Sequence, residues 1–161
     1  MYSKIYDFCK VRNVGSVYEN DPDEPTPRVK FLMSLLDSEG IEYELDKTQT
    51  NGLFKGATTL YNIILKGNSN KMVVAHHDVN NPNIDNANDN SCSVINAIMV
   101  KNLMPHIHVV LLDGEEFGGK GSKVIAKKYG GFGYCNSGKA KGWQYRQDCM
   151  PLHREILPVF T

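Results

Sequence analysis

Three polar clusters in the middle of the chain carry the side chains suited to chemistry: His76-His77-Asp78, residues 85–89, and Glu115-Glu116. Imidazole nitrogens and carboxylate oxygens are ligands that zinc takes in proteins, and a catalytic zinc site keeps one position open for water. A carboxylate beside such an ion can accept a proton and return it during the reaction. The clusters therefore predict a zinc centre with an acid–base carboxylate.

Short apolar runs precede two of these clusters. Residues 72–75 lead into His76, and residues 109–112 lead into Asp113 and the two glutamates behind it. A run of four apolar, mostly β-branched residues bounded by polar ones is typical of a buried strand. Polar groups at the carboxyl ends of such strands lie where open α/β sheets bind ligands. We therefore expect the three clusters to converge at one edge of a sheet.

The spacing within each cluster suggests a division of labour. His76 and Asp78 lie two residues apart at a strand end, so their side chains share a face and Asp78 can orient the imidazole. Asp89, with Asn90 and Ser91, is expected to begin a helix and to hold a carboxylate that can bridge two ions. Taken singly, each cluster is more often a surface turn, a helix cap or a solvated helix entry. Their joint occurrence at three structural boundaries favours a site.

These motifs resemble those of the di-zinc aminopeptidase family, the co-catalytic metallopeptidases that include aminopeptidase Y and the bacterial leucyl aminopeptidases. The similar stretch is residues 72–122, with His-x-Asp at 76–78, Asp-Asn-small-small at 89–92 and Glu-Glu-x-Gly at 115–118. The resemblance implies a zinc-dependent exopeptidase, a metallopeptidase that releases the amino-terminal residue of a peptide or amino-acid-derivative substrate.

The resemblance also implies a role for each residue. His76 would bind one zinc ion, Asp89 would bridge both ions, and Glu116 would bind the second. Glu115 would act as general base and then as general acid, while Asp78 would orient His76.

Two further ligands of the family, an Asp and a His, have no clear counterpart in this chain. Asp148 is the nearest candidate for the Asp, although its neighbours do not match the family's strand, and His153 comes too early for the final His. The resemblance implies two bound zinc ions. A site that holds one zinc ion, or none, stays open as an alternative.

Two other functions remain open beside aminopeptidase activity. One is glutaminyl cyclisation, a single-zinc reaction on a related scaffold. The other is a catalytically impaired or non-catalytic protein that keeps the metallopeptidase fold.

The expected fold is α/β, a three-layer αβα arrangement around a mixed, mostly parallel central sheet. The expectation leaves open that this sheet lacks its C-terminal strands. Residues 1–161 are expected to form a single zinc-peptidase-like domain, with 131–161 as a divergent tail. Thr26 suits a helix N-cap, Pro27 its first turn and Gly40 its end. The helices are expected at 27–39, 90–103 and 122–129, and the strands near 41–46, 59–66, 71–76 and 107–113.

Composition narrows the choice of partners. The formal net charge is zero, with 41% hydrophobic and 22% charged residues, and the basic residues do not gather in one run. Neither a nucleic acid nor a membrane is therefore an expected partner. The amino terminus has no continuous apolar core of a signal peptide, and the four cysteines form no CxxC, so reduced thiols in the cytoplasm are expected. No pattern indicates an oligomeric state.

Overall fold

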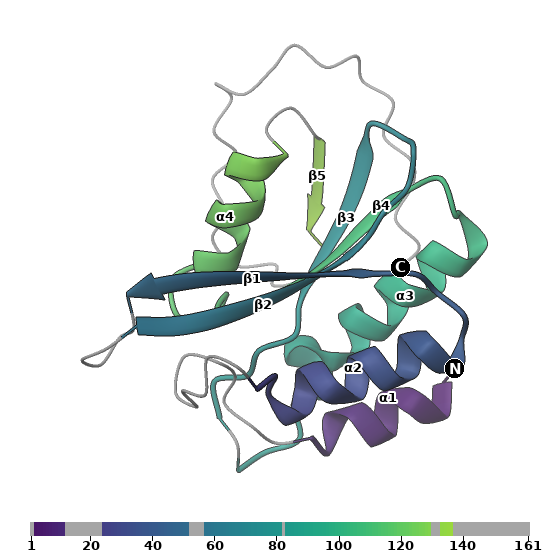
Figure 1. Cartoon of the computed structure of the whole chain (residues 1–161). Helices are drawn as coiled ribbons and strands as arrows, with labels where there is room; N and C mark the ends of the chain where they lie inside the picture. Colours follow the sequence, from purple (N-terminus) through teal and green to yellow (C-terminus); the bar gives the residue numbers. More distant parts are fainter. Residues whose placement is uncertain (1, 12–23, 52–56, 82, 130–132, 137–161) are drawn as a thin grey trace.

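The computed structural model describes residues 2–11, 24–51, 57–81, 83–129 and 133–136. Within these residues, five strands form one open mixed sheet in the order β1-β2-β4-β3-β5 (Figure 1). The strands are β1 Glu44–Asn51, β2 Ala57–Leu65, β3 Lys71–His76, β4 His108–Leu112 and β5 Gly133–Asn136.

Four helices are described alongside this sheet. They are α1 Tyr2–Cys9, α2 Pro27–Ser38, α3 Cys92–Leu103 and α4 Lys120–Lys128, with a short irregular turn, Ala87–Ser91, leading into α3. Figure 1 shows α1, α2 and α3 gathered together, with α4 apart from them.

Because side chains alternate along each strand, the strands supply apolar groups to both faces of the sheet. In β4, Val109 and Leu111 belong to the large cluster that α1, α2 and α3 cover, whereas Val110 and Leu112 pack with Ile125 of α4. Successive side chains of a strand point to opposite faces, so a strand that is apolar at every position must be covered twice. The apolar runs in the sequence are therefore the cause of the double covering.

Helix α2 begins and ends as its sequence predicts. The Thr26 hydroxyl accepts a hydrogen bond from the Val29 amide at 3.4 Å, and Pro27 occupies the first turn. Gly40 follows the helix with φ +65°, a left-handed conformation in which a side chain would be strained.

The central strands lie where they were expected, and the outer ones do not. β1 begins at Glu44 instead of residue 41 and continues to Asn51, past the expected end at residue 46; it pairs antiparallel with β2 along its whole length. Ladder hydrogen bonds join backbone groups, so an edge strand needs no apolar side chains. For the same reason β5, in a tail where no strand was expected, pairs parallel with β3.

The α/β class is confirmed, and its finer description is not. Among the described strands, β3 pairs in parallel with β4 and β5, while β2 pairs antiparallel with β1 and β4, so a mostly parallel sheet is not established. The three-layer arrangement and the single domain stay predictions. No helix in the described part of the chain is long and apolar enough to span a membrane.

We predict that Gly121→Ala destabilises the junction between β4 and α4. A Cβ at this position would lie 2.1 Å from the Asp113 carbonyl oxygen and 2.5 Å from the Asn62 side-chain oxygen. Overpacking of this kind lowers the free energy of unfolding by about 1–3 kcal/mol. Urea denaturation measures it, with Lys127→Ala, an exposed change on the same helix, as the control. A Gly121→Ala protein as stable as the control would contradict the packing described here.

Candidate metal centre

The register between β3 and β4 brings the predicted clusters to one edge of the sheet. The two strands run parallel, and His76, the last residue of β3, lies opposite Leu112, the last residue of β4. The chain that leaves β4 therefore turns over the end of β3 and brings Glu115 and Glu116 to His76. The predicted convergence of these two clusters is confirmed.

The third cluster joins them through Asp89. The Oδ1 atom of Asp89 lies 3.1 Å from Nε2 of His76, and Oε2 of Glu115 lies 3.9 Å from the same nitrogen. Ligand atoms of His76, Glu115 and Glu116 all lie within 4.8 Å of one another. The imidazole is nearly buried, whereas Glu115 keeps 24% of its side chain exposed. The site thus has a buried nitrogen donor and carboxylates that face solvent.

Asp78 holds the two strand ends together. Its carboxylate is fully buried and accepts hydrogen bonds from the backbone amides of Glu115 at 3.1 Å and Glu116 at 3.0 Å. The same carboxylate lies 3.4 Å from Nδ1 of His76. Asp78 therefore orients the imidazole, as its spacing suggested, and also fixes the turn that carries both glutamates, which the sequence did not indicate.

Burial and charge act in opposite directions on His76 and Asp78. Burial by itself lowers the pKa of His76, but the carboxylates of Asp78, Glu115 and Asp89 together raise it above its ordinary value. Burial by itself raises the pKa of Asp78, but the hydrogen bond and charge of His76 hold it below its ordinary value. In the metal-free protein each group thus favours the charged form of the other.

Asp89 reaches the site by a different backbone from the one expected. Helix α3 begins at Cys92 and not at residue 90, and Ser91 makes no side-chain capping bond. The backbone at Asp89 (φ −132°, ψ 81°) and Asn90 (φ −142°, ψ 35°) is not helical. Asp89 therefore does not cap the helix, and the helix-start prediction is wrong. Its carboxylate turns to His76, a partner distant in sequence that local propensity cannot reveal.

Two buried groups beside the site were not anticipated. Asp113 accepts a hydrogen bond from the Tyr61 amide at 3.0 Å, and its own amide donates to the Asn62 side-chain oxygen at 3.0 Å. The buried His77 ring places Nε2 2.9 Å from the Tyr61 carbonyl oxygen, away from the cluster. These contacts tie the ends of β3 and β4 to β2. The sequence feature that could have indicated a role for Asp113 is its position as a charged residue directly after a buried strand.

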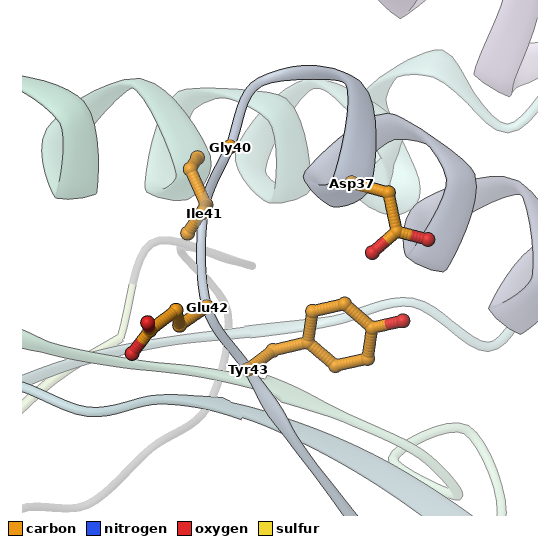
Figure 2. A pocket seen from close by; sticks show the side chains of 5 residues that line it. All are labelled: Asp37, Gly40, Ile41, Glu42 and Tyr43. Carbon is orange, nitrogen blue, oxygen red and sulfur yellow. The ribbon is translucent and has the colours of Figure 1, made fainter.

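Some predicted residues lie elsewhere or outside the description. Asp148 and His153 belong to residues 137–161, which lie outside the described part of the chain. The hollow of Figure 2 contains none of the predicted site residues; it is shallow, and its lining is Asp37, Gly40, Ile41, Glu42 and Tyr43. Tyr43 turns its hydroxyl toward Asp37 there, and burial together with that carboxylate raises the pKa of the phenol.

The donor set fits a zinc ion. His76 offers one ring nitrogen toward Asp89 and Glu115 while its other nitrogen faces Asp78. This is the arrangement of metal-binding histidines, whose second nitrogen is held by a carboxylate or carbonyl. A nitrogen with carboxylate oxygens is a zinc ligand set. His76, Asp89 and Glu116 are the described residues predicted to hold the ion, and Glu115 lies beside them with its carboxylate near the same imidazole nitrogen.

Comparison with known proteins gives structural matches only. The sequence matches no protein-family model and no curated protein. A glutaminyl cyclase from an Acidobacteriales bacterium has a TM-score of 0.58 at 20% identity, and the match covers 80% of this chain and 51% of that one. A glutaminyl cyclase from Fimbriiglobus ruber has a TM-score of 0.57 at 18% identity, covering 79% and 53%. The chain thus spans about half the length of these structures.

These matches correct the expected family. Both of these solved structures are glutaminyl cyclases and neither is a di-zinc aminopeptidase, so the assignment to the aminopeptidase family is wrong. The physical reason lies in the motifs themselves. Residues 72–122 build the strand ends and the turn of a shared scaffold, and these features do not report which nucleophile the site serves.

We predict that Asp78→Asn strongly destabilises the protein. Asparagine has the same size but only one acceptor oxygen for the two backbone amides. Its NH₂ group would face either one of these amide donors or the imidazole of His76. Breaking a buried, doubly hydrogen-bonded charge costs about 2–4 kcal/mol. Urea denaturation tests this, with Asp7→Asn, an exposed change on α1, as the control. Equal stability of the two variants would refute the role given to Asp78.

The same variant carries a pH signature in the metal-free protein. The pKa of Asp78 is held below its ordinary value of 3.8, so its ionised form stabilises the fold above that pH. This contribution is lost as the pH falls through the depressed value. The difference in unfolding free energy between wild type and Asp78→Asn should therefore be full near neutral pH and shrink below about pH 4. A constant difference would exclude ionisation of Asp78 as its source.

Proposed function

We propose that this chain carries a zinc-dependent site for glutaminyl cyclisation, the conversion of an amino-terminal glutamine into a pyroglutamyl residue. The observation that supports it is the cluster of His76, Glu115 and Glu116, with Asp89 against the imidazole, in a fold matched by glutaminyl cyclases. The substrate is a peptide, or an amino-acid derivative, with a free amino-terminal glutamine.

The reaction rearranges one molecule without water. The α-amino nitrogen forms a bond to the side-chain carboxamide carbon, the bond from that carbon to its nitrogen breaks, and ammonia leaves. A proton must move from the attacking nitrogen to the leaving one. A bound zinc ion would supply Lewis-acid polarisation of the carboxamide oxygen.

We assign the transfer of this proton to Glu115. Its carboxylate is partly exposed, its Oε2 lies 3.9 Å from Nε2 of His76, and Asp78 fixes its backbone amide. A carboxylate at that position can accept the proton of the amine and return it to the departing nitrogen. His76, Asp89 and Glu116 would hold the ion beside it. Asp78 contacts none of the reacting atoms and acts by positioning His76 and the turn.

We predict that Glu115→Gln slows cyclisation by about 100- to 10,000-fold and leaves zinc content unchanged, because general acid–base groups contribute factors of that size. The assay follows loss of ammonia from a synthetic peptide with amino-terminal glutamine by mass spectrometry, using full-length chain purified with zinc present. Glu42→Gln, an exposed change away from the cluster, is the matched control and should keep wild-type rate. Chelation should abolish the activity and added zinc should restore it.

A peptide that begins with alanine separates this reaction from peptide hydrolysis and should remain intact. Zinc-loaded protein that leaves the glutamine peptide at its spontaneous rate would refute the proposal. A protein that is folded but takes up no zinc would also refute it. That result would favour the other alternative, a non-catalytic protein that keeps the fold.

A further inference from the structure

Arg28 is a fully buried cation on α2, where the helix faces the end of β3. Its Nε donates to the His77 carbonyl oxygen at 2.5 Å, and its Nη2 donates to the Ser91 hydroxyl at 2.9 Å. Its Nη1 donates to the carbonyl oxygens of Phe8 at 3.1 Å and Val11 at 2.8 Å. One guanidinium thus joins three segments that are distant in the sequence.

The environment of Arg28 is unfavourable for a charge in itself. Burial lowers the pKa of Arg28 to about 10, and the charges of Cys9 and Asp78 offset only part of this. The Phe8 ring lies against the guanidinium, with 3.8 Å from the cation to the ring centre. A buried cation costs free energy unless its donors are all used, and replacing a whole buried ion pair by apolar side chains is often neutral or stabilising, whereas removing one partner is not. Stability by itself is therefore a weak reason for this residue.

Two of the bonds flank the candidate ligands. The His77 carbonyl belongs to the residue between His76 and Asp78, and Ser91 lies two residues after Asp89. The donors of a guanidinium lie in one rigid plane, so two oxygens bound to it are held at a set separation. The contact between His76 and Asp89, 3.1 Å from Nε2 to Oδ1, spans the same two segments.

We propose that Arg28 is the positioning residue of the metal centre, setting the distance between the segment that carries His76 and the segment that carries Asp89. It acts through the His77 backbone and the Ser91 hydroxyl. The inference rests on the proposed function only in treating these two residues as ligands.

Lys101 supplies a matched control. This nearly buried lysine of α3 donates to the carbonyl oxygens of Lys66 at 2.5 Å, Pro105 at 2.6 Å and Ile107 at 3.2 Å. It is a second buried cation that binds backbone carbonyls, but at the amino end of β4, the edge opposite to the candidate site. Loss of either cation should weaken the fold, and only loss of Arg28 should disturb the site.

The test compares Arg28→Met, Arg28→Lys, Ser91→Ala and Lys101→Met in the full chain. Hydrogen exchange of the metal-free proteins reports local opening. We expect Arg28→Met to speed exchange of the Ser91, Glu115 and Glu116 amides about tenfold more than Lys101→Met does. Zinc affinity, measured by competition with a chelating dye, should fall about 10- to 100-fold, as for other residues that orient ligands.

Two milder variants sharpen the expectation. Arg28→Lys should not restore zinc affinity, because an ammonium on a single stem does not hold two oxygens in a fixed plane. Ser91→Ala removes one of the four bonds of Arg28, together with the hydrogen bond between the Ser91 and Cys9 side chains, and should shift both readouts in the same direction by less. Lys101→Met should instead speed exchange of the Asn68 and Ser69 amides, which donate to the His106 carbonyl.

The outcomes separate the two proposals. Wild-type protein that binds zinc, with Arg28→Met binding it equally well, would overturn the positioning role and leave the proposed function standing. Wild-type protein that binds no zinc would overturn the proposed function, and the exchange pattern would still decide the role of Arg28. Faster exchange spread over the whole core in Arg28→Met, with no excess at the Ser91, Glu115 and Glu116 amides, would make Arg28 a general stabiliser and overturn the positioning role.

Discussion

The candidate site depends on one buried carboxylate. Asp78 accepts two backbone hydrogen bonds, from Glu115 and Glu116, and faces Nδ1 of His76. These contacts join the end of β3 to the turn that follows β4, and that turn carries the glutamates. An ionised carboxylate has acceptor capacity for all three groups at once, and neither an amide nor a hydroxyl of similar size does.

Directional contacts decide the geometry at this edge, whereas the hydrophobic effect decides the layers. Burial of apolar side chains is proportional to area and has no preferred direction, so it brings α3 and α4 onto the sheet without placing the loops between them. The loops are placed by buried polar groups: Asp113 binds the β2 backbone, and Arg28 binds the segments at His77 and Ser91. Because an unmade bond of a buried polar group is costly, such contacts permit few arrangements.

The corrected family assignment has a similar physical basis. A site of imidazole and carboxylates at the carboxyl edge of a sheet suits attack on a carbonyl by water or by an amine, since both need a polarised carbonyl and a proton acceptor. In the proposed site, residues 72–122 would supply these two features and leave the nucleophile undefined. The structural matches lie with glutaminyl cyclases, and they cover about half the length of those proteins. Fold similarity at this level of identity supports the scaffold.

The sequence by itself determined the α/β class, the buried strands β3 and β4, the caps of α2 and the meeting of His76 with Glu115 and Glu116. Each of these follows from short-range information: apolar runs, capping residues and the rule that parallel strands end at one edge. Only the tertiary structure decided that Asp89 turns from the helix to His76, that Asp78 binds the glutamate amides, and that Arg28 joins three segments. These contacts link residues 13 to 63 positions apart. Their partners are backbone or side-chain groups of kinds that occur at many positions in the chain. Only the folded chain selects among them, because it brings particular groups within hydrogen-bonding distance away from water.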